Sequence, residues 1–120
     1  MKRITVGEVQ EAYRKTGLKP QVESMFDTCF NQYEPKCGCG LGAIYMAADG
    51  PKRMTVTVSD VAKYVGLDRP YATGFSDGFD GEEANPRNWC GLADSEDARD
   101  AYDLGYTDGK AAGDVMLARV

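Results

Sequence analysis

Hydrophobic residues recur every three or four positions through most of the chain, which is the spacing of an amphipathic helix. The clearest case begins at Thr5, which forms a T-x-x-E capping box with Glu8, and Gly17 can end that helix in a left-handed conformation. We therefore expect a helix over about residues 5–16. Five further helices are predicted. They are one that begins at Pro20, one over about residues 40–48, one from Ser59 to Val65, one that includes Tyr71, and one from Asp94 or Ser95 toward residue 118.

One segment has the alternation of a strand instead of the period of a helix. The sequence RMTVTVS at 53–59 alternates weakly and could form one short strand or an extended linker, and no second segment offers a strand partner. At 120 residues the chain can bury a core of its own as one domain. The pattern predicts a mainly α fold over residues 1–120: a compact single-domain helical bundle that contains a helix-turn-helix-like unit, with room for one short strand.

One motif occurs twice. YATGFSDG begins at Tyr71 and YDLGYTDG at Tyr102, and both read Tyr, two residues, Gly, Phe or Tyr, one residue, Asp, Gly. On a helix, the aromatic residues and the glycines of each copy share one face. A glycine inside a helix costs about 0.5–1 kcal/mol relative to alanine, so the repeated glycines need a compensating contact. We predict that the two helices pack on each other, glycine face toward aromatic face.

The aspartates of the motif do not have the spacing of a known ion or phosphate loop. Asp77 and Asp80 miss the alternation of a calcium-binding EF-hand, and Gly109-Lys110 is followed by alanine, not by the serine or threonine of a phosphate loop. Asp77 and Asp108 stand at equivalent places in the two copies, so they could pair with basic side chains or hold a turn. A catalytic pair of carboxylates is also open, but nothing in the sequence brings the two together.

Charge is distributed unevenly along the chain, which has a net charge of -5. Residues 1–56 hold eight Lys and Arg against six Asp and Glu, whereas residues 57–120 hold six against thirteen. An acidic half lacks the side chains that contact phosphates, so we do not expect nucleic acid as the partner. It suits a solvated surface or a basic partner. Histidine is absent, which removes the commonest general base and the commonest zinc ligand.

The segment TVSDVAKYVGLDRPYATGFSDG at 57–78 resembles the helix-turn-helix of lac-repressor-type regulators. The matching positions are a small residue, a turn glycine and the apolar residues that hold the two helices together: Ala62, Gly66, Val61, Val65, Leu67, Ala72 and Phe75. The resemblance implies two helices joined by a tight turn, the second of which would bind DNA. However, residues 57–83 hold two basic and six acidic residues, a charge that opposes DNA binding.

A second resemblance covers separate parts of the chain. CGLGA at 39–43, followed by YATGFSDGFDG and YDLGYTDG, is similar to sequences of small bacterial or phage proteins without an assigned function. This resemblance implies no activity.

The cysteines offer a second kind of site. Cys29, Cys37, Cys39 and Cys90 match the number of ligands in a tetrahedral zinc site, although C-x-C is a tight spacing and Cys29 lies in the apolar stripe of the helix after Pro20. Cys37 and Cys39 could instead form a redox-active dithiol. Cys39 would be the more reactive, because a thiol at a helix N-terminus has a lowered pKa. We expect no cofactor, with zinc as the alternative, and free thiols in a reducing cytoplasm.

The function predicted from these features is the binding of a macromolecular partner. We expect a small, acidic, non-enzymatic protein that binds another protein as a regulator or inhibitor in the cytoplasm, because MKRITVGEVQ lacks the apolar run of a signal peptide. No segment is long and apolar enough to span a membrane. The candidate contacts are one loop tryptophan and the acidic face of the last helix: Trp89, Asp97, Asp100, Asp103 and Asp108. The alternatives are the cysteine-based redox or metal site and a DNA-binding regulator, and a homodimer is left open.

Overall fold

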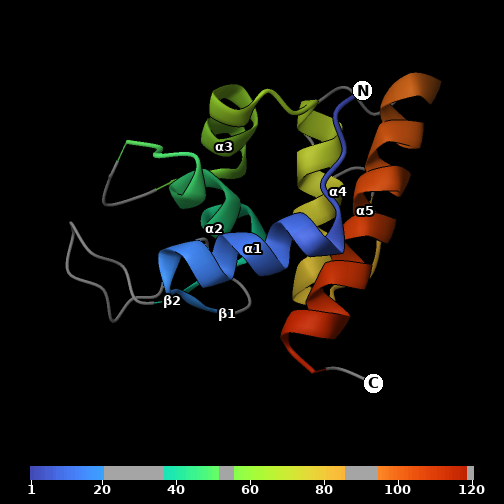
Figure 1. Cartoon of the computed structure of the whole chain (residues 1–120). Helices are drawn as coiled ribbons and strands as arrows, with labels where there is room; N and C mark the ends of the chain where they lie inside the picture. The colour runs from blue at the N-terminus through green and yellow to red at the C-terminus, as the bar shows by residue number, and fades with distance from the viewer. Residues whose placement is uncertain (21–36, 52–55, 86–94, 119–120) are drawn as a thin grey trace.

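Helices make up most of the part of the chain that the computed structural model describes, which is residues 1–20, 37–51, 56–85 and 95–118. The elements in chain order are α1 (Val6–Thr16), β1 (Lys19–Pro20), β2 (Cys37–Gly38), α2 (Gly40–Ala47), α3 (Val58–Val65), α4 (Arg69–Asp80) and α5 (Glu96–Met116). The predicted mainly α, single-domain bundle is confirmed (Figure 1), and its Cα radius of gyration is 13.2 Å. No helix of the described residues is long and apolar enough to cross a membrane.

The ends of α1 and α5 follow the predicted capping residues. Thr5 and Glu8 form both hydrogen bonds of a capping box, and Gly17 ends α1 in the left-handed conformation at φ 72°. Ser95 caps α5 by accepting a hydrogen bond from the backbone N–H of Ala98. These local signals therefore fix where the first and last helices begin.

The segment expected to form a strand leads directly into α3. Thr57 and Asp60 make a second capping box, so α3 begins at Val58, before the predicted cap Ser59. The predicted strand is therefore absent over residues 56–59, and its remaining part lies outside the described residues.

The predicted helix after Gly17 does not begin at Pro20. Pro20 lies in β1, which pairs in parallel with β2 through the register Lys19 with Cys37 and Pro20 with Gly38. A ladder this short tolerates proline, whose missing N–H removes only one possible donor. The rest of that predicted helix lies outside the described residues.

Helices α4 and α5 run side by side in the same direction, and their backbones touch (Figure 1). A Cβ atom added to Gly74 would lie 2.1 Å from the carbonyl oxygen of Tyr102. In the reciprocal contact, a Cβ atom on Gly105 would lie 2.0 Å from the carbonyl oxygen of Tyr71. Both distances are far inside van der Waals contact, so only glycine fits at these two positions.

The same contact repeats one turn further along both helices. A Cβ atom would lie 2.2 Å from the Tyr106 carbonyl oxygen if added to Gly78, and 2.0 Å from the Phe75 carbonyl oxygen if added to Gly109. The prediction that the two motif helices pack through their glycines is confirmed. One detail was wrong: each glycine meets the backbone of the other helix, not an aromatic face.

The aromatic residues of α4 form the core on its other side. Phe75 and Phe79 are fully buried, their ring centroids are 6.5 Å apart, and Tyr13 of α1 stacks on Phe79 at 6.4 Å. A Cβ atom on Gly40, the first residue of α2, would lie 2.9 Å from the Phe79 ring. The α4 helix thus packs its glycines against α5 and its rings against α1 and α2.

This double packing encloses α4. None of residues 71–80 is exposed, although Gly66 at φ 76° joins α3 to α4 through the short turn expected of a helix-turn-helix. Figure 1 shows α4 between α5 and the pair α2 and α3. A DNA-reading helix must present a row of side chains to the major groove, and α4 could do so only if α5 moved away.

Replacement of a contact glycine tests this packing. Gly109→Ala places a methyl group against the Phe75 carbonyl oxygen, so the helices must separate, and we expect the free energy of unfolding to fall by about 1–3 kcal/mol in urea melts. Helix propensity alone predicts that the free energy of unfolding rises by about 1 kcal/mol. The sign of the measured change therefore distinguishes backbone contact from helix propensity. Gly7→Ala in α1 is the matched control, because its Cβ would meet only Thr5 Oγ1 at 3.9 Å, and it should not destabilise. A Gly109→Ala protein as stable as its parent would contradict the backbone contact.

Candidate functional site

The two copies of the repeated motif exchange hydrogen bonds. The Tyr71 hydroxyl donates to Asp108 Oδ2 at 2.6 Å, and the Tyr102 hydroxyl donates to Asp77 Oδ2 at 2.5 Å. In each bond the first residue of one copy reaches the aspartate of the other copy. From the sequence, the two aspartates stand at equivalent positions and were expected to pair with basic side chains, to hold a turn or to form a catalytic pair. The structure assigns each one a tyrosine on the neighbouring helix, not the other carboxylate.

Each tyrosine hydroxyl also holds a neighbouring segment of backbone. Tyr71 accepts a hydrogen bond from the Ile4 N–H at 2.7 Å, and Tyr102 accepts one from the Asn85 N–H at 2.8 Å. Burial is the main cause that raises the pKa of both hydroxyls, so both keep the proton that they donate to aspartate at neutral pH. The reciprocal pairs therefore join α4 to α5 and also fix the segments before α1 and after α4.

Asp108 has a further partner in Arg3. Arg3 donates from Nε to Oδ2 at 3.0 Å and from Nη2 to Oδ1 at 2.8 Å, and the Asp108 side chain is only 14% exposed. Burial raises the pKa of Asp108, but hydrogen bonds from Arg3 and Tyr71 outweigh it, and the net pKa is lowered. The expectation that Asp108 pairs with a basic side chain is confirmed, and its carboxylate, one of the candidate partner contacts, is thus already bound within the chain.

The other acidic candidates on α5 are placed differently. Asp97, Asp100 and Asp103 are all exposed, and within the part of the chain that the structure describes their carboxylates take part in no ion pair or hydrogen bond. Their charges thus remain open to solvent or to a partner. The fifth candidate contact, Trp89, lies outside the described residues.

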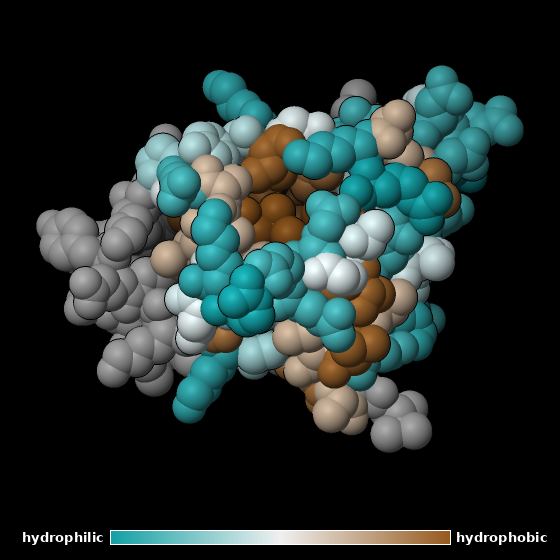
Figure 2. Space-filling view, in the orientation of Figure 1, coloured by the Kyte–Doolittle hydropathy of each residue, from teal (hydrophilic) through white to brown (hydrophobic). Residues whose placement is uncertain are grey.

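Apolar side chains continue the exposed face of α5 toward its C-terminus. Leu104 is 36% exposed, Val115 is 51% exposed, and Ala111 between them is exposed as well. With 3.6 residues per turn, these side chains share one face with two of the aspartates. We name this face the α5 stripe and define it by its exposed residues: Asp97, Asp100, Leu104, Ala111 and Val115. Figure 2 shows hydrophilic atoms over the N-terminal turns of α5 and hydrophobic atoms over its C-terminal turns.

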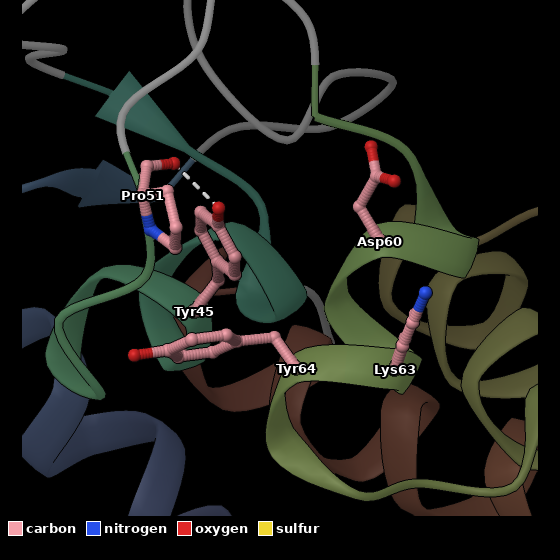
Figure 3. Close-up of a pocket in the computed structure, with 5 residues that line it drawn as sticks. All are labelled: Tyr45, Pro51, Asp60, Lys63 and Tyr64. Atoms are coloured by element: carbon pink, nitrogen blue, oxygen red, sulfur yellow. Dashed lines mark hydrogen bonds between the residues drawn. The ribbon is translucent and has the colours of Figure 1, made fainter.

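An open hollow of about 410 Å³ lies between α2 and α3. Figure 3 shows Tyr45 and Pro51 on one side of it and Asp60 and Lys63 of α3 on the other. The Tyr45 hydroxyl donates to the Pro51 carbonyl oxygen at 2.5 Å, and the Tyr64 hydroxyl donates to the carbonyl oxygens of the turn after α2. This tyrosine pair was not predicted from the sequence. The Tyr64 hydroxyl holds the turn against α3, and the Tyr45 hydroxyl holds Pro51 beside α2.

The cysteine at the start of α2 is buried. Cys39 is the N-cap residue, as the sequence suggested, but it is only 2% exposed. Burial is the largest influence on its thiol and raises the pKa to about 12, although the backbone hydrogen bonds of Gly42 and Leu41 lower it. The prediction that the helix N-terminus lowers the pKa of Cys39 was therefore wrong, because desolvation outweighs the effect of the helix N-terminus.

The other cysteines do not complete a site in the described structure. Cys37 lies in β2, and Cys29 and Cys90 lie outside the described residues. Among the described residues, no group of three or more Cys, His, Asp and Glu side chains could hold a metal ion. The zinc alternative needs residues that the structure does not describe, so it stays a prediction.

Comparison of the chain with models of protein families, with curated proteins and with solved structures found no match.

The candidate side chains described above fall into two kinds. The reciprocal Tyr–Asp pairs, Arg3 and Cys39 have partners or burial inside the fold. The residues that define the α5 stripe are exposed.

The role of Asp108 in the fold can be tested by its dependence on pH. Its pKa is lowered from 3.8 on folding, so its stabilisation is complete above about pH 4 and is lost as the pH falls through the folded-state pKa. We expect Asp108→Asn to lose about 1–3 kcal/mol of unfolding free energy at pH 7, by urea melts, and a smaller amount once the pH falls through the folded-state pKa. A double-mutant cycle with Tyr71→Phe should show coupling of about 0.5–3 kcal/mol.

Asp103→Asn is the matched control for this experiment, because it removes the same charge from the exposed side of the same helix. We expect its unfolding free energy to stay within about 0.5 kcal/mol of the parent at every pH. Equal effects of the two substitutions would show that the buried network does not stabilise the fold.

The accessibility of Cys39 gives a separate test. Iodoacetamide at about pH 8 reacts with thiolates, so Cys39 should remain unmodified in the folded protein and become modified once urea unfolds the chain. Peptide mapping by mass spectrometry distinguishes it from the other three cysteines. Alkylation of Cys39 at the same rate in the folded and the unfolded protein would contradict its buried position.

Proposed function

We propose that the protein is a small, non-enzymatic regulator or inhibitor that binds a basic protein partner through the α5 stripe, and that it does so in the cytoplasm. One observation carries the proposal: Asp97 and Asp100 of the stripe, and Asp103 beside it on the same helix, are exposed and have no ion pair among the described residues. Some other acidic residues do have basic partners, as in the pairs Arg3–Asp108, Arg14–Glu11 and Lys110–Asp114, whereas Glu82 and Glu83 have no ion pair among the described residues.

The folding of the chain gives no reason for this arrangement of charge. Asp97 lies in the first turn of α5, where a negative charge interacts favourably with the helix dipole. Asp100 and Asp103 lie beyond that turn, and like charges three residues apart repel each other. A basic partner would remove this repulsion and would also attract the acidic half of the chain at long range.

Groups that could instead support catalysis or DNA binding have other roles in the fold. Asp77 and Asp108 each hold a tyrosine of the other helix, and the raised pKa of Cys39 keeps its thiol protonated at neutral pH. The enclosed position of α4 leaves no row of its side chains for a DNA groove. A free Cys39 thiol fits the reducing cytoplasm. These observations support a binding protein over the alternatives from the sequence.

Affinity capture with a charge-reversed variant tests the proposal. Immobilised parent protein should retain a basic protein from an extract of the source cells, and added salt should release it. Asp97→Lys/Asp100→Lys should not retain it, because the stripe then repels the partner. Glu82→Lys/Glu83→Lys is the matched control, since it makes the same charge change at exposed residues outside α5 and should behave like the parent.

Urea melts should first show that both variants remain folded, because all four positions are exposed. The α5 variant should lose up to about 1 kcal/mol, because Lys at position 97 interacts unfavourably with the helix dipole. Retention of the same proteins by all three forms would contradict the proposal, because net charge alone would then explain the binding. The proposal would also be contradicted if the parent retained no protein from the extract, or if the Asp97→Lys/Asp100→Lys variant retained every protein that the parent retains.

A further inference from the structure

Resting on the proposed function, we infer that the α5 stripe binds one amphipathic helix of the partner, which lies antiparallel to α5 and carries Lys or Arg in its last turns and apolar residues in the turns before them. Three features of α5 lead to this occupant: the shape of the stripe, the order of charge along it, and a hollow at its apolar end.

The stripe has the dimensions of a helix-binding face. It runs from Asp97 to Val115 on an unbroken helix, which at 1.5 Å per residue is about 27 Å. Its exposed side chains follow the i, i+3, i+4 and i+7 spacings by which one helix packs on another. A partner helix of about five turns could therefore cover the whole stripe.

The order of charge along the stripe sets the direction of the partner. Asp97 and Asp100 occupy the N-terminal turns of α5, and the apolar residues Leu104, Ala111 and Val115 follow. Lys and Arg are stabilising in the last turn of a helix because they interact favourably with its dipole. A partner helix that lies antiparallel brings such a basic C-terminal turn onto the two aspartates. In this antiparallel direction, the C-terminus of the partner helix, which is the negative end of its dipole, lies beside the N-terminus of α5, which is the positive end of the α5 dipole.

A hollow at the apolar end can receive an anchoring side chain. It measures about 260 Å³ and is lined by Arg3, Ile4, Thr5, Val6, Asp108 and Ala111. Ala111 belongs both to this hollow and to the stripe, so a leucine of the partner helix that packs on Ala111 can also reach Val6. Side chains that fill such pockets provide much of the binding energy of an interface.

A second copy of the chain does not fit the same face. Two antiparallel α5 helices related by a two-fold axis near residue 108 would set Asp100 against Val115, which removes a carboxylate from water without a basic partner. Two parallel copies would bring Asp97 and Asp100 of one copy next to Asp97 and Asp100 of the other, and these like charges would repel each other. A homodimer through the α5 stripe is therefore disfavoured in either direction.

Two synthetic peptides with the same residues in opposite order test the inference on the full chain. Each has about 18 residues on an alanine background. The first carries leucines in its N-terminal half and lysines and arginines in its C-terminal half, all on one helical face, and the second has the reverse order. Fluorescence anisotropy should show that the first binds about tenfold tighter or more, and about 0.5 M salt should weaken this binding.

Variants of the full chain locate the binding and complete the test. Asp97→Lys/Asp100→Lys should abolish binding of the first peptide, Ala111→Gln should weaken it about fivefold or more by obstructing the hollow, and Glu82→Lys/Glu83→Lys should leave it unchanged. Equal affinity for the two peptides, no binding of either, or binding that the α5 variants do not alter would overturn the inference. If cell extract still yields a partner that depends on Asp97 and Asp100, the helix inference alone fails and the proposed function stands.

Discussion

The direct contact between the backbones of α4 and α5 is the constraint on which the other features of this fold depend. Four glycines, two from each helix, face carbonyl oxygens of the opposite helix at distances that exclude a single Cβ atom. In the observed register Gly74 lies near Gly105 and Gly78 near Gly109. A shift of α5 by one turn in one direction would set Ala101 against Gly74, but a shift in the other direction would set Gly109 and Gly113 against Gly74 and Gly78. The reciprocal Tyr–Asp hydrogen bonds distinguish this second register from the observed one, because Tyr71 would then face Ala112 in place of Asp108.

That alignment explains why the two copies of the motif exchange partners. In two parallel helices with matching glycines, equivalent residues face each other across a local two-fold relation. Tyr71 then reaches Asp108, and Tyr102 reaches Asp77. The symmetry is broken outside the pair, because one tyrosine binds the backbone before α1 and the other binds the backbone after α4. One interface thus positions two other parts of the chain.

Much of the helical structure could be predicted because it depends on neighbours in the sequence. Capping at Thr5, the stop at Gly17 and the start of α5 at Ser95 were all predicted, and the cost of glycine in a helix correctly predicted a helix-helix contact. The start of α3 was missed because Thr57 and Asp60 also satisfy the capping-box pattern. The pairing of β1 with β2 involves two residues from each strand, too few for any periodicity to show.

The candidate site was harder to predict because it depends on which side of a helix faces the core. Asp97 and Asp108 are the same residue type on the same helix, yet one is exposed and the other is bound to Tyr71 and Arg3. Only the register of α4 against α5 distinguishes them. Cys39 illustrates the same limit: its place at a helix N-terminus was predicted, but its burial comes from packing that is distant in sequence.

The two faces of α5 have separate physical roles, and this separation makes the surface open to experiment. Its inner face tolerates no larger side chain, since each contact glycine lies against a carbonyl oxygen. The side chains of the stripe on its outer face are exposed and take part in no hydrogen bond or ion pair among the described residues. Substitutions of exposed residues away from such contacts usually change stability by less than about 0.5 kcal/mol. An effect of the stripe on binding can therefore be attributed to the surface itself, whereas the same test on Asp108 would also disturb the network that aligns the two helices.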